Sequence, residues 1–579
     1  MNDNDFEDGD KDENTVKNML IVFYEENGEV VGYYSDQEWT QTPDSDKDDD
    51  TESRLQWKEA EVVPIKLLRP GEPFYAIAFL NHDMTDEELT GKTMSEVSTI
   101  VKDTFCYHVD NTDYFLMTNA GYFDSGDDYC IATKLEGSVF QTPEEARNSP
   151  AITIYVERAA ARVDLKIKND AVQKYQVFYA GTEYELQFMP EHWGLTATEK
   201  ENYLLKNMKE NLSRYGGEDY PRGFSEWINY ERHRTYWAET PNYSSYKYPG
   251  SGAATEDASL NYIGYDELKS STITVGAAEY ARKYTFEHTF DAEDFKNAAN
   301  PYTVPTSIVI GGEYEAVKKA DGTTRLDFRG GGFYLRTIAN TKQIYLEKNT
   351  DGKNDLFEAY LNEQNVIYTK DAVGAGAKQT YTPVRYGPGL EDDFEVKNTN
   401  KSYSANGAEA ESSNAYTLQL KDAAVGKYYL CTYDPEGDRY EYSAIGDDAA
   451  LAKANVEIQK NVGSAFMCSG GRSFFYIPVL HFITSESYPG SGNGGAEYTG
   501  SLATDNDGRV INKTGEFGIV RNHIYRLTIE KIDGLGFGEP GDSGFKPLPD
   551  VDEDEQWYLH AKLEILSWHV IEFGFDLKQ

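Results

Sequence analysis

The feature that most constrains the fold is the end of the chain, where residues 557–577 form a long apolar strand pattern. Apolar and charged residues alternate, and the phase of the alternation changes near Ser567, which predicts a bulge or bend between two strand segments. In an extended conformation about 21 residues reach roughly 70 Å, which exceeds one β-sandwich domain. The strand can therefore close its own domain or fill a groove in another molecule. The predicted groove-filling residues are Ala561, Leu563, Ile565, Trp568, Val570, Phe573, Phe575 and Leu577.

An acidic, proline-containing segment, residues 547–556, connects this strand to the rest of the chain. Proline and like charges favour an extended linker that packs poorly. The strand is thus expected to be detachable from the domain that precedes it.

The charge of the chain restricts its partners. There are 99 Asp and Glu residues against 55 Lys and Arg residues, a formal net charge of −44. Nucleic acids and anionic membrane surfaces favour basic proteins, so neither is an expected partner. No apolar stretch approaches the ~20 residues of a membrane span, and the start of the sequence does not have the pattern of a signal peptide. A cytoplasmic protein and a chain without its export signal both fit this pattern.

Most of the chain predicts short strands separated by turns, and 13% aromatic residues favour such strands. Asn27-Gly28 between two apolar runs predicts a hairpin. The first thirteen residues, rich in acids, are expected to be disordered or loosely held. A domain boundary is placed near Glu157. Helices are predicted over Thr85–Lys102, Ala197–Tyr215 and Asp448–Val462.

Four cysteines lie two in each half of the chain, Cys106 and Cys130, then Cys431 and Cys468. A local disulfide in each half and four buried thiols are both compatible with this spacing. No CxxC pair occurs, so the spacing gives no support to a zinc site.

Motifs for catalysis or cofactor binding are weak. Gly536-x-Gly538-x-x-Gly541 fits the dinucleotide fingerprint, but Pro540 and an acidic linker follow where a helix is required. Asp505–Gly508 has oxygen ligands suited to Ca²⁺ but not the spacing of an EF-hand, and a turn is the simpler interpretation. Neither HExxH nor Gly-x-Ser-x-Gly occurs. The sequence therefore predicts no enzyme, no cofactor and no metal.

Several segments together carry a family pattern. They occur at the start, at the expected domain junction, late in the second half and at the end of the chain. They are Asp3–Phe6 with Asn18–Tyr24, Val156–Arg162, Ser473–Phe482, and Gly518–Ile529 with Gly534–Gly536 and Leu566–His569.

In this order the segments resemble the Mfa-type fimbrillins, the major shaft subunits of the type V pili of Bacteroidales. The resemblance implies two transthyretin-like β-sandwich domains, here residues 1–157 and 158–546, then the linker 547–556 and a donor strand 557–579. Residues 291–446 match nothing in the family pattern. On this resemblance, Asp3–Phe6 lies near the start of the mature subunit.

The resemblance also implies a function. Such subunits are exported as lipoproteins, and an arginine-specific protease removes an N-terminal segment that includes one strand. The C-terminal strand of a neighbouring subunit then fills the groove, so the expected partners are identical subunits and the fimbrial tip and anchor subunits. The implied location is a fimbrium at the outer membrane, and its surface ligand is not specified.

A different class of protein also fits the composition. Aromatic loops such as Trp227–Tyr230 and Arg234–Trp237 suit stacking on sugars, as in a surface glycan-binding lipoprotein that remains monomeric. A detachable C-terminal strand distinguishes the two, because a monomeric binding protein has no use for one.

Overall fold

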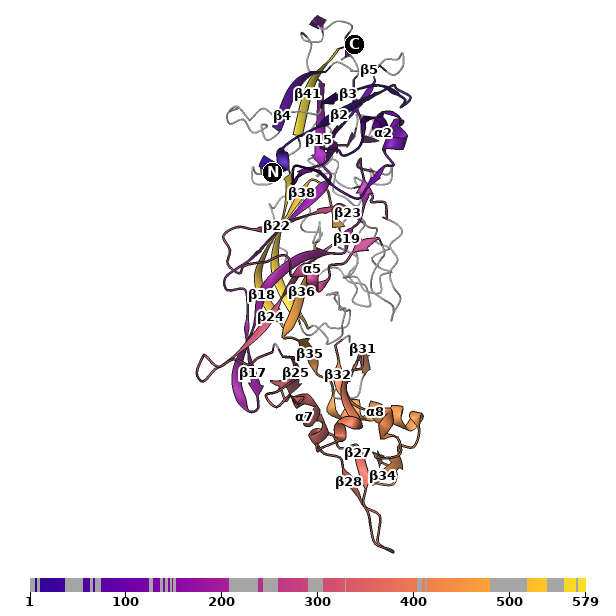
Figure 1. The fold of residues 1–579 in the computed structure, drawn as a ribbon, viewed down its shortest axis with the longest axis vertical. Coiled ribbons are helices and arrows are strands. Elements are labelled where there is room, and N and C mark those ends of the chain that lie inside the picture. Colours follow the sequence, from indigo (N-terminus) through magenta and orange to yellow (C-terminus); the bar gives the residue numbers. More distant parts are fainter. Residues whose placement is uncertain are drawn as a thin grey trace.

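The chain folds almost entirely into β-strands with a few short helices, which confirms the all-β class. Figure 1 shows an elongated molecule with both termini in its upper half. The structure is a computed structural model that describes residues 6–7, 11–36, 56–62, 66–67, 74–123, 129–135, 139–140, 144–145, 148, 152–207, 238–242, 259–289, 306–328, 330–403, 409–411, 414–479, 518–538, 557–568 and 571–578.

A ten-stranded sheet forms the upper end of the molecule (Figure 1). Its strands in order are β14 (Val139–Phe140), β41 (Ile571–Lys578), β15 (Ile152–Arg158), β10 (Met117–Asn119), β6 (Tyr75–Leu80), β2 (Met19–Tyr24), β3 (Val30–Asp36) and β5 (Lys66–Leu67), with β4 (Gln56–Val62) beside β41 and β13 (Thr133–Lys134) beside β6.

The predicted hairpin is confirmed, because β2 and β3 are antiparallel and Gly28 has a φ of 82° in the turn between them. Alternate residues of β2 enter two different cores, so this sheet is covered on both faces.

The single helix expected over Thr85–Lys102 is instead two short helices, α2 (Asp86–Thr90) and α3 (Met94–Val97). Each has its own capping box, with Thr85 and Glu88 in α2 and Thr93 and Glu96 in α3. A second N-cap restarts the helix after Gly91, so the continuous apolar spacing did not reveal the break.

Two further sheets pack around the largest core of the molecule. The five-stranded sheet has the order β1 (Phe6–Glu7), β40 (Trp557–Trp568), β38 (His523–Gly534), β16 (Ala160–Ile167) and β22 (Ala281–Phe286). The eight-stranded sheet has the order β35 (Phe466–Ser469), β25 (Gly332–Ile338), β26 (Thr341–Leu346), β17 (Lys174–Tyr179), β18 (Thr182–Thr196), β24 (Ser307–Lys318), β36 (Arg472–Pro478) and β39 (Phe537–Gly538).

The chain passes from the ten-stranded to the five-stranded sheet at Ala159, the one residue between β15 and β16. This crossing lies two residues after Glu157, where a domain boundary is predicted. The domain limits themselves stay a prediction.

The lower end of the molecule has its own apolar core (Figure 1). Most of it comes from the part of the chain that the family pattern leaves unmatched. Its elements are α7 (Asp355–Glu363), β27 (Ile367–Lys370), β28 (Tyr381–Pro383), β29 (Phe394–Asn398), β30 (Lys401–Tyr403), β31 (Glu409–Glu411), β32 (Tyr416–Leu420), β33 (Tyr429–Asp434), β34 (Arg439–Ala444) and α8 (Asp448–Val462). The predicted helix over Asp448–Val462 is confirmed as α8.

The helix predicted over Ala197–Tyr215 is wrong in its described part, which contains the short strands β19 (Thr198–Glu199) and β20 (Asn202–Tyr203). Ala197 has a φ of 52°, outside the helical region, and Leu204 and Leu205 are buried against the upper sheet. Tertiary packing here overrides helix propensity. Residues 208–215 lie outside the described part of the chain.

The remaining motifs have simple outcomes. All four cysteines are free thiols. Gly536 and Gly538 lie at β39, which pairs with β36 and opens no helix. Residues 227–237, 505–508 and 547–556 lie outside the described residues. Within the described part of the chain, no group of His, Cys, Asp and Glu side chains could hold a metal ion, and no helix is long and apolar enough to cross a membrane.

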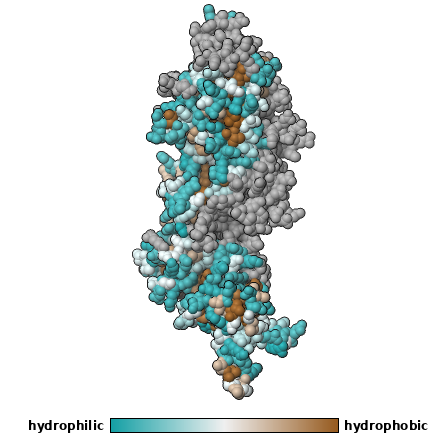
Figure 2. Space-filling model, turned by 45° about the vertical axis from the view of Figure 1, so that its right-hand side comes forward, coloured by the Kyte–Doolittle hydropathy of each residue, from teal (hydrophilic) through white to brown (hydrophobic). Residues whose placement is uncertain are grey.

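On the face shown in Figure 2, the described residues are predominantly hydrophilic, with small apolar patches. This surface agrees with the acidic composition, because charged residues remain in contact with solvent.

A buried histidine joins β2 to the end of β6. Asn18 accepts a hydrogen bond from the backbone N–H of His82 and donates one to its carbonyl, both at 2.9 Å. The imidazole Nδ1 lies 2.9 Å from the carbonyl oxygen of Met84. Burial lowers the pKa of His82, against the opposing effect of that carbonyl. The neutral imidazole is therefore the form that the fold accommodates.

This burial predicts a pH dependence of stability. The pKa of the His82 imidazole is lower in the folded state than its value of about 6.5 in the unfolded chain. As the pH falls towards 6.5 and below, the unfolded chain therefore binds a proton that the folded chain does not yet bind. The free energy of unfolding should therefore fall as the pH drops from 7.5 to 5.5, with a slope of up to about 1.4 kcal/mol per pH unit for one proton. In His82→Asn, whose amide can still donate to Met84, the slope measured by denaturant titration should be smaller by this contribution. Equal slopes would contradict the prediction.

Candidate functional site

The C-terminal segment occupies interior places in two sheets of its own chain. Strand β40 pairs antiparallel with β38, and a bulge separates Ile529 from Lys531. Positions 561, 563 and 565 lie opposite Ile529, Leu527 and Tyr525, which are buried in the largest core. Directly opposite residues in a ladder share one face of the sheet. The register therefore places positions 561, 563 and 565 on the same face of the sheet as these three residues.

Strand β41 continues into the ten-stranded sheet. It runs antiparallel to β15, with Phe573 opposite Ile154 and Phe575 opposite Ile152, and parallel to β4 along its other edge. Leu577 lies opposite Val62 of β4 and Val139 of β14. In the described part of the chain, β4 and β14 pair with no strand other than β41. The last strand thus holds two others in the sheet.

The predicted bend in the strand corresponds to a change of sheet. β40 ends at Trp568 in the five-stranded sheet and β41 begins at Ile571 in the ten-stranded sheet. Val570 lies between the two strands, outside the described residues. The one segment therefore joins the upper and middle parts of the molecule.

The described part of the N-terminal arm, residues 6–7 and 11–14, reaches the same strand through β1. β1 pairs parallel with the end of β40, with Phe6 opposite Ser567 and Glu7 opposite Trp568. Helix α1 (Lys11–Asn14) follows, and Glu13 and Asn14 are only 2% and 4% exposed. The expectation of a disordered start is therefore wrong for the described part of the arm.

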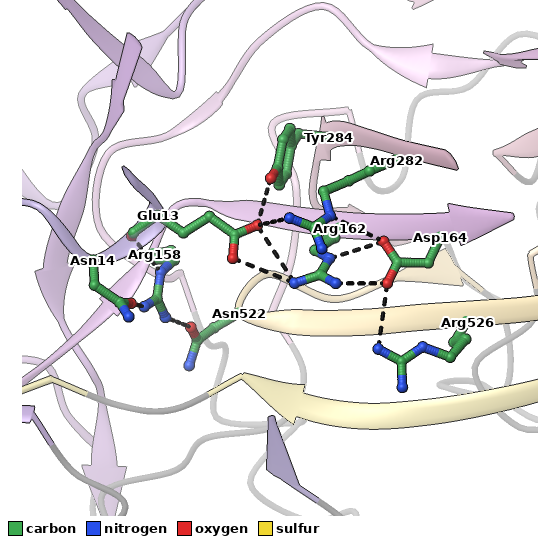
Figure 3. A network of polar contacts seen from close by, with 9 residues as sticks. All are labelled: Glu13, Asn14, Arg158, Arg162, Asp164, Arg282, Tyr284, Asn522 and Arg526. Atoms are coloured by element: carbon green, nitrogen blue, oxygen red, sulfur yellow. Dashed lines mark hydrogen bonds and ion pairs between the residues drawn. The ribbon is translucent and has the colours of Figure 1, made fainter. Parts of the chain in front are cut away.

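Burial of the arm is explained by a network of charged side chains at the junction of the sheets (Figure 3). The Glu13 carboxylate accepts hydrogen bonds from Arg162 Nη1 at 3.3 Å, from Arg282 Nη1 at 3.4 Å and from the hydroxyl of Tyr284. Arg162 in turn makes a bidentate pair with Asp164, at 2.8 and 2.7 Å. Arg526 Nη2 lies 3.4 Å from the carboxylate of Asp164.

A second arginine binds the backbone of the arm. Arg158 is fully buried, and its guanidinium donates to the carbonyl oxygen of Glu13 at 3.0 Å and to the side-chain oxygen of Asn14. It also donates to Asn522 Oδ1, at 3.2 Å, at the turn before β38. Burial lowers the pKa of Arg158 to about 10, while the Glu13 carboxylate acts in the opposite direction. A buried guanidinium needs such partners, because an unpaired buried charge is strongly destabilising.

The pKa values of Arg162 and Tyr284 fit this network. Burial opposes the charge of Arg162, but hydrogen bonds and ion pairs with Asp164 and Glu13 outweigh it, so its pKa is raised. The pKa of Tyr284 is raised by burial and by its hydrogen bond to Glu13. Both groups therefore keep the protonated form in which they donate to carboxylates.

Sequence reasoning found one half of this site and missed the other. The alternation in residues 557–577 indicated the strand, and the groove-filling residues stay a prediction. The arm and its arginines were missed, although Arg158 and Arg162 flank a run of three alanines at the predicted junction. Charged residues within an otherwise apolar strand are the signal that could have indicated a buried ionic network.

This geometry defines an all-β chain whose upper and middle parts are joined by its own last strand. Residues 492–573 match the family model described as major fimbrial subunit protein type IV, fimbrillin, C-terminal. This part of the chain is thus similar to the C-terminal region of the fimbrillins, in agreement with the resemblance. No curated protein matches the chain.

Solved structures show weaker likenesses. Two are each described as a "putative cell adhesion protein". The one from Parabacteroides distasonis ATCC 8503 has 10% identity and a TM-score of 0.32 over 98% of this chain and 93% of that chain. The one from Bacteroides eggerthii DSM 20697 has 9% identity and a TM-score of 0.32 over 99% and 92%. The tip fimbrial protein Mfa3 from Porphyromonas gingivalis, with C-terminal truncation, has 9% identity and a TM-score of 0.24 over 65% and 95%.

Proposed function

We propose that this chain is a shaft subunit of a cell-surface fimbria and polymerises by exchange of residues 557–579 between neighbouring subunits. The observation that carries the proposal is the position of β41. This terminal strand, behind an acidic linker, is the described partner of β4, β14 and β15 at once. The fimbrillin match over residues 492–573 includes β40 and the first three residues of β41.

Exchange needs no new surface, because a neighbour's strand would make the same backbone and side-chain contacts that the chain makes within itself. The linker of residues 547–556 spans at most roughly 35 Å when extended. Main-chain hydrogen bonds to the groove would provide affinity, and alternate side chains would fix the register. A head-to-tail contact that does not close generates a filament rather than a ring.

The groove-filling residues of this proposal are those predicted from the sequence. Their register opposite buried residues of β38 and β15 supports the assignment for positions 561, 563, 565 and 573, and position 575 lies opposite the partly buried Ile152. Trp568 lies at the end of β40, and Leu577 lies beside β4 and β14. Val570 is assigned from sequence alone.

The wider assembly follows from the resemblance to the family. An arginine-specific protease would remove an N-terminal segment, and tip and anchor subunits would complete the fimbria at the outer membrane after export as a lipoprotein. The role is structural rather than catalytic. The two transthyretin-like domains and their limits belong to the same proposal.

The test compares the intact chain with a chain that ends at Gln556, by size-exclusion chromatography and negative-stain electron microscopy. Filaments or a ladder of oligomers are expected from the intact chain, and folded monomers from the truncated chain. Identical monomers from both chains would contradict polymerisation under the conditions used. An unfolded truncated chain would show that the strand belongs only to its own domain and would favour the monomeric glycan-binding alternative.

A further inference from the structure

A pocket of about 660 Å³ lies in the lower part of the molecule, between helix α8 and the strands β29 and β32. These elements lie outside the fimbrillin match and far from the C-terminal strand along the molecule (Figure 1). The volume is within the range of small-molecule sites, roughly 300–1,000 Å³.

The pocket is basic although the chain has a net charge of −44. Its described lining includes Lys397, Lys401 and Lys460 and no acidic residue. Lys460 pairs with Glu457 at 3.3 Å, and Lys401 lies opposite Glu411 in the ladder of β30 and β31. Lys397 is exposed and forms no ion pair with any residue that the structure describes. One cation at the pocket is therefore available to a ligand.

Two amides on α8 differ in a way that points to a ligand. Asn455 is fixed on the edge of β32, since its side chain accepts from the N–H of Leu420 at 2.8 Å and donates to the carbonyl of Leu420 at 3.2 Å. Gln459, one helical turn further on, is only 6% exposed and lines the pocket. Its side-chain amide has no hydrogen bond to any described residue. Its amide atoms are not sealed from solvent, so they are open to the pocket and can hydrogen-bond a molecule there.

We propose that this pocket binds a carboxylated carbohydrate, such as a uronic acid residue. Lys397 would pair with the carboxylate, and the amides of Gln459 and Gln419 would bind hydroxyl groups. An amide both donates and accepts, as a sugar hydroxyl does, whereas a phosphate dianion only accepts and would leave the amide oxygens unmatched. Ala452 and the partly exposed Val456 provide an apolar surface for the C–H groups of the ring.

The test uses the full-length chain and isothermal titration calorimetry with glucuronate, glucose and inorganic phosphate as probes. Glucuronate should bind saturably and more tightly than glucose, which lacks the carboxylate. Lys397→Gln should weaken glucuronate binding by about tenfold, which is the usual effect of one charge-assisted contact. Gln459→Leu should weaken both sugars. The matched control is Lys453→Gln, which removes an exposed lysine of α8 that does not line the pocket. This variant should bind glucuronate and glucose as the parent chain does.

Absence of saturable glucuronate binding would overturn the proposal, as would equal loss of binding in the Lys453→Gln control. Phosphate binding as tight as that of glucuronate would reduce the pocket to a general anion site and overturn the carbohydrate assignment. Lys397 is a surface residue, so its variant keeps the test valid even if Gln459→Leu fails to fold. The result does not depend on polymerisation, because monomers and filaments carry the same pocket.

Discussion

Substitution of Ile565 by Asp is expected to abolish filament formation while the monomer remains folded outside the C-terminal strand and the short strands that pair with it alone. Position 565 lies opposite Tyr525, which is fully buried in the largest core. A carboxylate at this register position has to be buried without a partner, which costs several kcal/mol, about 2–7 for an unpaired polar group and more for a charge. The strand would therefore leave the groove of its own chain and that of a neighbour. Negative-stain electron microscopy and size-exclusion chromatography measure the loss of filaments.

The control for this prediction is Lys562→Asp in the same strand. Position 562 lies opposite Thr528, which is partly exposed and belongs to the other face of the ladder. This substitution changes the charge more than Ile565→Asp does, yet filaments should persist. Normal filaments from Ile565→Asp would show that this strand does not fill the groove. Equal loss from both variants would assign the effect to charge rather than to the buried face.

The strand was predictable because its information is local. Alternation of apolar and charged residues fixes which face is buried, and the change of phase near Ser567 corresponds to the change from the five-stranded to the ten-stranded sheet. The hairpin at Gly28 and helix α8 were predictable for the same reason, since a turn residue and a helical repeat determine each one.

The N-terminal arm was not predictable in this way. Glu13 belongs to an acidic stretch without periodicity, and its partners Arg162, Arg282 and Tyr284 lie about 150 to 270 positions along the chain. Composition predicts disorder for such a stretch. The burial of Glu13 follows instead from charge pairing across the fold, which a local pattern does not contain.

Substitution of Glu13 by Gln is expected to produce the largest loss of stability of any single change in the arm. The variant keeps the shape of the side chain but removes the charge that Arg162 and Arg282 contact. Removal of one partner from a buried ion pair costs about 3–5 kcal/mol, because the other charge stays buried and unpaired. The lower part of this range is expected, since Arg162 keeps Asp164 and the side chain of Arg282 is 28% exposed. Denaturant titration measures the change in the free energy of unfolding.

The same variant should loosen the arm locally. Glu13 and Asn14 are fixed by Arg158 and Arg162, and β1 covers the last two residues of β40, so release of the arm exposes an edge of the C-terminal strand. Hydrogen exchange should therefore accelerate in residues 11–18 and at the end of β40. Glu26→Gln, at an exposed position in the first hairpin, is the matched control and should remain within about 0.5 kcal/mol of the parent chain. If Glu13→Gln behaves like that control, the buried carboxylate does not hold the arm. In that case the pairing of β1 with β40 alone has to account for its position.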